Sequence, residues 1–195
     1  MTDTFAHSKV LNIPNMLTIG RIVCVPLVAG ALYFGDGHTS RWIAASLFVF
    51  AALSDFLDGY LARIWQQQSE FGRMLDPIAD KLIICAAITM LIYKDTIKDV
   101  ATWAALIILC REILVSGLRE YLARLDVTLH VTMLAKCKTA VQMLAIVLLL
   151  VGPAADAQGF AATFIGVWLL WVAAILTIWT GTNYINAAMK HALKY

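Results

Sequence analysis

Charged residues are scarce in this chain of 195 residues. Aspartate, glutamate, lysine and arginine make up 14% of it, whereas 61% of the residues are hydrophobic. A soluble domain typically contains about 25% charged and about 45–50% apolar residues. The composition therefore excludes a disordered chain, a nucleic-acid-binding module and an ordinary soluble domain. The net charge of +2 is also too small to indicate a polyanionic partner such as nucleic acid.

The chain also lacks paired cysteine motifs. Its four cysteines lie singly within apolar runs, and no two are separated by only two residues. Such cysteines are typically small buried hydrophobes, so we expect neither disulfides nor a zinc site. A removable signal peptide is not expected either. The first apolar run, 16–34, is longer than the usual signal core of about 7–15 residues, and Arg21 interrupts it.

What the chain has instead is a series of long apolar runs. A transmembrane helix uses roughly 20 apolar residues, so a chain of this length with short loops holds about six spans. We predict an all-α polytopic membrane protein that forms one domain over 1–195. The last run is long enough to contain a break near Gly181. The predicted transmembrane helices are 16–35, 42–63, 78–93, 100–118, 131–151 and 161–188.

Residues that prefer turns or end helices separate these runs. A glycine-containing turn is expected at 35–37, and a polar loop at 66–69. The third helix is expected to end at 94–95 and the fifth at 152–153.

The lysines and arginines predict the orientation. Cytoplasmic segments of membrane proteins carry an excess of both residues. Most of the lysines and arginines outside the predicted helices lie in segments on the same side of the membrane as the N-terminus. We therefore expect the N- and C-termini to be cytoplasmic. Residues 1–15 are expected either to lie in the membrane interface as an amphipathic segment or to form a plain tail.

Four aspartates fall near the predicted cytoplasmic ends of the second and third helices. A carboxylate at membrane depth costs about 2.5–3.5 kcal/mol on insertion scales, and residues of this kind usually mark a functional site. Four carboxylates on adjacent helix ends need a countercharge, which a divalent cation would supply. The four residues are Asp55, Asp58, Asp76 and Asp80.

The spacing of these aspartates supports a metal site. On a helix of 3.6 residues per turn, Asp55 and Asp58 share a stripe with Gly59 and Ala62, two small residues that leave room for a ligand. The second aspartate pair is four residues apart and shares a face of the next helix. Two facing carboxylate pairs can hold two hard cations such as magnesium or manganese. Two such metals can clamp a phosphoryl displacement.

Structural explanations remain open for each pair. Asp76 precedes Pro77, and this order is typical of an N-cap followed by proline at the first helical position. Asp55 and Asp58 would also be explained as solvated helix-end residues paired with Arg63.

The same residues resemble the complete signature of the CDP-alcohol phosphotransferase family. The family consists of membrane enzymes with six helices, usually homodimers, that join a CDP-linked group to an alcohol and release CMP. The length of the chain and its number of apolar runs agree with the family. The matching pattern is Asp55-x2-Asp58-Gly59-x2-Ala62-Arg63-x8-Gly72-x3-Asp76-x3-Asp80.

The resemblance implies roles for individual residues. The four aspartates would hold two divalent cations, Mg²⁺ or Mn²⁺, and Asp80 would also act as the general base. The donor would be CDP-diacylglycerol, whose acyl tails stay in the membrane lipid. The residues implied for donor binding are Asn15, Thr18, Gly59, Ala62, Arg63, Ser69 and Gly72.

Basic residues of the fourth and fifth predicted helices suggest where the acceptor binds. An arginine inside a membrane span, such as Arg111, is usually functional. The alternatives are a structural ion pair with a neighbouring helix and, for the other basic residues, anchoring on the cytoplasmic side. A basic pocket favours an acceptor that carries a phosphate. The predicted pocket consists of Arg111, Ser116, Arg119, Lys136 and Lys138.

Together these expectations describe an enzyme that transfers a phosphatidyl group from CDP-diacylglycerol to glycerol 3-phosphate. The expected location is a bacterial inner membrane, with the active site facing the cytoplasm. Two alternatives remain. The first is the same chemistry with phosphatidylglycerol, an inositol phosphate or serine as acceptor. The second is a divalent-cation transporter, which is disfavoured because the aspartates cluster at one face and the sequence shows no repeat.

Overall fold

The computed structural model describes residues 13–65, 70–125 and 133–192. Within these ranges the chain forms six α-helices and no strand, which confirms the predicted all-α class. The predicted loop at 66–69 and most of the N-terminal segment lie outside the described residues. The helices are α1 (Ile13–Phe34), α2 (His38–Trp65), α3 (Glu70–Tyr93), α4 (Ala101–Arg124), α5 (Met133–Asp156) and α6 (Ala162–Ala192).

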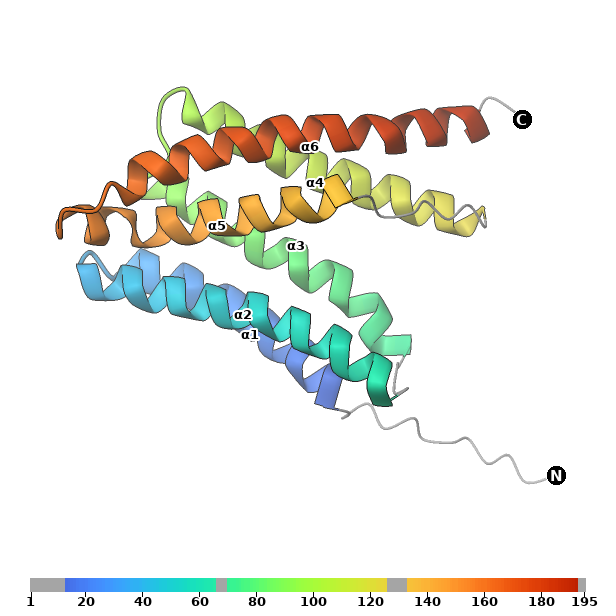
Figure 1. Cartoon of the computed structure of the whole chain (residues 1–195). Helices are drawn as coiled ribbons and strands as arrows, with labels where there is room; N and C mark the ends of the chain where they lie inside the picture. Colours follow the sequence, from blue (N-terminus) through green and yellow to red (C-terminus); the bar gives the residue numbers. More distant parts are fainter. Residues whose placement is uncertain (1–12, 66–69, 126–132, 193–195) are drawn as a thin grey trace.

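The helices run along one long axis, with α3 crossing obliquely between the α1–α2 pair and the others (Figure 1). The connections α1–α2, α3–α4 and α5–α6 lie at one end of the bundle. The opposite end holds the first residues of α1, α3 and α5 and the last residues of α2, α4 and α6. The chain therefore runs up and down the bundle.

Small residues let the helices pack closely. The most extensive contact joins α5 and α6, while α1 packs against both α2 and α3, and α4 packs against α6. The core combines large side chains such as Phe48 and Ile88 with many fully buried alanines. A Cβ atom added to Gly166 of α6 would lie 2.8 Å from Cγ of Leu149 on α5. The absence of a side chain at Gly166 therefore sets the close approach of these two helices.

The outside of the bundle is strongly apolar. Large side chains such as Trp103, Ile113, Phe164 and Trp179 are 64–70% exposed. So many exposed large apolar side chains are unusual for a protein in water and normal for one in lipid. Among the residues that the structure describes, four helices are long and apolar enough to cross a membrane, namely α1, α4, α5 and α6. The other two, α2 and α3, carry the aspartates, and the count of six spans remains a prediction.

Several predicted helix ends are confirmed and others are wrong. The turn at 35–37 and the end of the third helix at Tyr93 are where the sequence placed them. The fifth helix does not end at 152–153, because Pro153 removes only one backbone hydrogen bond and the helix continues to Asp156. The predicted break near Gly181 is also wrong. The bare α-carbon of this residue faces the Arg111 side chain inside a continuous α6.

The start of the third helix differs most from the prediction. The helix begins at Glu70 rather than at residue 78, so Asp76 and Pro77 lie inside it. Asp76 is therefore not an N-cap, and the structural explanation for that residue is wrong. The proline is tolerated because the helix loses only the bond from residue 77 to the carbonyl of residue 73.

Candidate active site

A buried arginine joins the carboxylates of two helices. Arg21 of α1 is 1% exposed, and its Nη1 atom lies 2.9 Å from Oδ1 of Asp55 on α2. The same nitrogen donates a hydrogen bond to Oδ1 of Asp80 on α3 at 2.5 Å. A buried guanidinium is stable only when its charge is compensated. The two carboxylates, which are 25 residues apart in sequence, therefore meet at one point.

A second contact fixes the other aspartate of α3. Thr18 precedes Arg21 by almost one turn of α1, and its hydroxyl donates to Oδ1 of Asp76 at 2.5 Å. Asp76 and Asp80 thus both face α1, as their spacing of four residues predicts. We call Asp55, Asp76, Asp80 and the two α1 residues that bind them the carboxylate cluster.

The donor set of this cluster fits part of a cation site. Carboxylate oxygens are the ligands that magnesium and manganese prefer, and Asp55 and Asp80 already share one cationic group. Within the described residues, no three histidine, cysteine, aspartate or glutamate side chains form a group that could hold a metal. The side chain of Asp58 lies outside those residues.

A cavity of about 750 Å³ lies between α3 and α4. Glu112, Ser116 and Arg119, which are spaced by four and three residues along α4, line it together. Lys81, which directly follows Asp80 of the carboxylate cluster, lines the α3 side of this cavity. Much of the remaining lining is apolar and includes Met74, Ile78, Leu82, Ile113 and Val115.

One network of polar side chains links α4, α5 and α6. Oε1 of Glu112 accepts hydrogen bonds from Nη1 of Arg111, at 3.1 Å, and from Nζ of the buried Lys138 on α5. Arg111 also donates from Nε to the carbonyl oxygen of Thr177, at 3.1 Å, and from Nη2 to Oγ1 of Thr180, at 3.0 Å. The guanidinium of Arg111 therefore holds α4 against α6 through hydrogen bonds to neutral groups. Its ion pair is with Glu112 of its own helix and not with a neighbouring helix.

A second arginine of α4 also contacts α6. Nη2 of Arg119 donates to the hydroxyl of Tyr184 at 3.1 Å, and the guanidinium carbon lies 5.5 Å from the centre of the tyrosine ring. Hydrogen bonding and the cation–π contact together fix Arg119 at the cavity wall.

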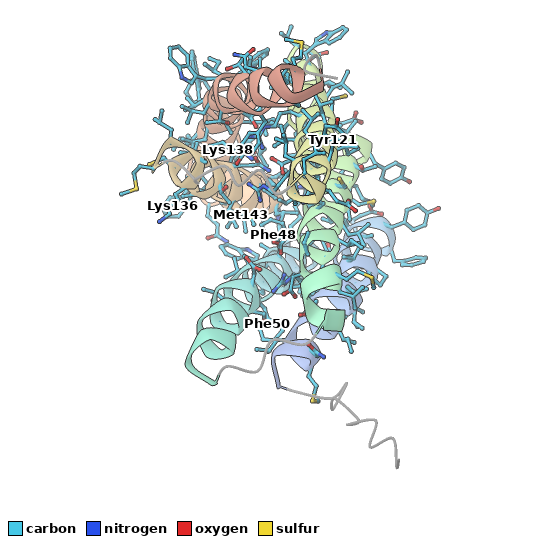
Figure 2. The ribbon with its side chains drawn as sticks, turned by 90° about the vertical axis from the view of Figure 1, so that its right-hand side faces the viewer. Phe48, Phe50, Tyr121, Lys136, Lys138 and Met143 are labelled. Atoms are coloured by element: carbon cyan, nitrogen blue, oxygen red, sulfur yellow. The ribbon has the colours of Figure 1, made fainter. Side chains whose placement is uncertain are left out.

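The two lysines predicted for the acceptor pocket lie on different sides of α5. Figure 2 views the bundle from the end where α3 begins, and Lys138 points into the space among α4, α5 and α6. Lys138 is 4% exposed, whereas Lys136 is exposed on the outer side of the same helix. The structure therefore brings Arg111, Ser116, Arg119 and Lys138 to one region and sets Lys136 apart from it.

The residues predicted for donor binding are only partly described. Asn15 and Thr18 on α1 and Gly72 on α3 are buried near the start of their helices. The remaining residues predicted to bind the donor lie wholly or partly outside what the structure describes. The surroundings of Gly59 and the side chains of Ala62 and Arg63 are not among the described parts, and neither is residue Ser69.

Three residues take part in this site although the sequence did not assign them to it. Arg21 interrupts an apolar run, and an intramembrane arginine was a usable signal of a site. Lys81 stands next to Asp80, but nothing in the pattern showed that it faces a cavity. Tyr184 gave no signal, because its role depends on how α6 packs against α4.

The fold and this site define a helical membrane protein in which a carboxylate cluster adjoins a basic cavity. The family model of the CDP-alcohol phosphatidyltransferases matches residues 11–179. The chain belongs to this family.

Relatives with assigned names cover almost the whole chain. A CDP-diacylglycerol–glycerol-3-phosphate 3-phosphatidyltransferase of Rickettsia felis is 44% identical over 92% of this chain and 97% of its own. The protein of that name from Pseudomonas fluorescens is 40% identical, with coverage of 93% and 92%. A second form from Arabidopsis thaliana is 36% identical, with coverage of 99% and 86%.

Proposed function

We propose that this chain transfers a phosphatidyl group from CDP-diacylglycerol to glycerol 3-phosphate, giving phosphatidylglycerophosphate and CMP. The observation that carries the proposal is the meeting of Asp55 and Asp80 at Arg21, directly beside a basic cavity. The names of relatives at 36–44% identity support the choice of donor and acceptor.

The reaction exchanges one phosphorus–oxygen bond for another. The acceptor hydroxyl oxygen bonds to the phosphorus that bears diacylglycerol, and the bond from this phosphorus to the bridging oxygen breaks. CMP leaves with that oxygen. Asp80 accepts the hydroxyl proton, for which its carboxylate must come within about 2.6–3.2 Å of the acceptor oxygen. The contacts of Arg21 and Thr18 hold the carboxylates in place before substrate binds.

We further propose that Asp55, Asp58, Asp76 and Asp80 hold two divalent cations, Mg²⁺ or Mn²⁺. When bound, these cations would neutralise the charge of the diphosphate. The donor's nucleotide would lie beside the small residues of α2. Its contacts would come from Asn15, Thr18, Gly59, Ala62, Arg63, Ser69 and Gly72.

The acceptor's phosphate is proposed to lie in the α3–α4 cavity. Three basic residues, Lys81, Arg111 and Arg119, line it against two acidic ones, Glu112 and Glu120. This balance favours an anionic acceptor over neutral serine. Arg119 and Ser116 are the proposed direct contacts, and Lys138 and Arg111 add positive charge behind Glu112. Lys136 would attract the acceptor from the outer side of α5.

The remaining proposals concern the setting of the enzyme. The distribution of lysine and arginine supports an active site that faces the cytoplasm. The bacterial relatives support a bacterial inner membrane as the location. The family resemblance supports a homodimer.

The direct test measures CMP released by the purified protein in detergent with CDP-diacylglycerol and magnesium. Glycerol 3-phosphate, serine, phosphatidylglycerol and inositol phosphate are supplied in separate reactions. We expect release with glycerol 3-phosphate at least about tenfold faster than with the other acceptors. Release with serine alone would contradict the basic acceptor pocket, and cation flux without CMP release would favour a transporter.

A further inference from the structure

Lys81 stands between the carboxylate cluster and the α3–α4 cavity. We propose that its ammonium group binds the phosphate of the acceptor and so selects a phosphorylated alcohol; this rests on the proposed function. Successive residues of a helix point about 100° apart. Asp80 accordingly contacts Arg21 on α1, while Lys81 lines the cavity that faces α4.

The ammonium group of Lys81 is available for an anion. Arg111 and Lys138 both donate to Glu112, so a buried carboxylate already holds their charges. In the described part of the chain, Lys81 donates to the carbonyl oxygen of Pro77 at 3.0 Å, in an exposed contact within its own helix. An ammonium group has three donors. Lys81 can therefore bind phosphate without breaking a buried ion pair.

Lys81 and Arg119 place two cationic groups on the wall of the α3–α4 cavity. Lys81 directly follows Asp80 of the carboxylate cluster and lines the same cavity as Glu112 of the polar network of α4. Arg119 lines the same cavity and is held there by Tyr184. A phosphate between Lys81 and Arg119 would receive charge-assisted hydrogen bonds from both α3 and α4.

The size of the acceptor agrees with this placement. In glycerol 3-phosphate only the short glycerol backbone separates the reacting hydroxyl from the phosphate. When this hydroxyl is bound at Asp80, the phosphate of the same molecule must lie close to Asp80. Lys81, which follows Asp80 and faces the cavity, is suitably placed to bind this phosphate. Glycerol itself would gain nothing from Lys81.

The kinetic test compares Lys81→Met with the wild-type enzyme in detergent. Loss of a charge-assisted contact predicts a rise of about 10- to 100-fold in the KM for glycerol 3-phosphate. The KM for CDP-diacylglycerol should stay within about twofold. Lys81→Arg keeps the charge and should recover most of the affinity. Lys98→Met, which removes an exposed lysine from the α3–α4 connection, is the matched control and should change neither constant.

A binding test uses the native cysteine in the cavity wall. Cys85 lines the cavity, and a variant with serine at the other three cysteines leaves it as the only thiol. Glycerol 3-phosphate should slow alkylation of Cys85, whereas glycerol should not. Lys81→Met, or Lys81→Gln if the methionine variant does not fold, should abolish this protection.

Two results would overturn the role of Lys81. One is an unchanged KM for glycerol 3-phosphate together with intact protection of Cys85. The other is an equal rise in the KM of both substrates in Lys81→Met and Lys81→Gln alike, which would mean that Lys81 does not act selectively on the acceptor. By contrast, absence of acceptor-dependent CMP release in the wild type would refute the proposed function itself.

Discussion

At the scale of single residues, the site depends on charges that compensate one another inside the bundle. Arg21 holds two carboxylates, and Glu112 holds two cations. Removing one partner from such a group leaves a charge that neither water nor protein solvates well. Single substitutions here should therefore change both stability and function.

Arg21→Met tests the carboxylate cluster. The variant leaves Asp55 and Asp80 facing each other without their shared cation. Without added metal, we expect a loss of about 1.5–3 kcal/mol in the free energy of unfolding. Added Mg²⁺ should stabilise the variant more than the wild type, because the freed carboxylates can bind it. Thermal unfolding in detergent, with and without EDTA, measures the effect. An equal response to magnesium in both proteins would contradict this account.

Glu112→Gln tests the network of α4, α5 and α6. It leaves the buried Lys138 without a carboxylate, which should cost about 3–5 kcal/mol of stability. The double variant Glu112→Gln/Lys138→Met removes both charges and should recover much of the loss. The free energies of unfolding of the wild type and the two variants, measured by denaturation under the same conditions, test this prediction. A double variant as unstable as the single one would show that the ion pair is not the cause.

At the scale of helices, close packing depends on particular glycines. Gly166 approaches Leu149 on the neighbouring helix, and a Cβ would overlap with it at 2.8 Å. The nearest atom to a Cβ at Gly181 is Cγ of Arg111 at 3.5 Å, an ordinary contact. The two glycines of α6 thus differ in the room around them.

Gly166→Ala and Gly181→Ala form a matched pair on α6. The first should destabilise the protein by about 1–3 kcal/mol, because a buried leucine must shift. The second should be neutral or stabilising by about 0.5–1 kcal/mol, because alanine favours a helix over glycine. Melting temperatures in detergent compare the two. Similar losses in both variants would argue against the packing of α5 on α6.

The helices also show what the sequence could and could not predict. Apolar runs and turn residues placed six helices, because hydrophobic length and turn chemistry act locally. The predicted start of α3 was wrong because Pro77, a residue that usually marks a helix boundary, is tolerated inside the helix. The spacing of Asp76 and Asp80 predicted the face that they share. The meeting of Asp55 and Asp80 at Arg21 depends on how α1 packs against α2 and α3, which periodicity does not encode.

At the scale of the whole molecule, the polar groups gather in one half of an apolar bundle. The carboxylate cluster and the basic cavity lie toward the end where α3 begins. The opposite end has its own exposed ion pair, in which the hydrogen bond from Lys94 lowers the pKa of Asp36. The proposed orientation places that second end outside the cell.

Single-cysteine variants test this orientation in intact cells, in a background where the four native cysteines are serine. Asp36→Cys should react with a membrane-impermeant maleimide added outside. Lys194→Cys should react only after the cells are permeabilised, because lysines and arginines favour the cytoplasmic side. The reverse pattern would invert the proposed topology and place the site outside.

The central claim is that the carboxylate cluster performs the transfer. Asp80→Asn keeps the shape of the side chain but removes its proton acceptor, whereas Asp36→Asn removes an exposed aspartate at the other end of the bundle. The most direct measurement is CMP release that depends on glycerol 3-phosphate. The account predicts a loss of at least about 100-fold for Asp80→Asn and near wild-type release for Asp36→Asn. Wild-type release from Asp80→Asn would contradict the claim.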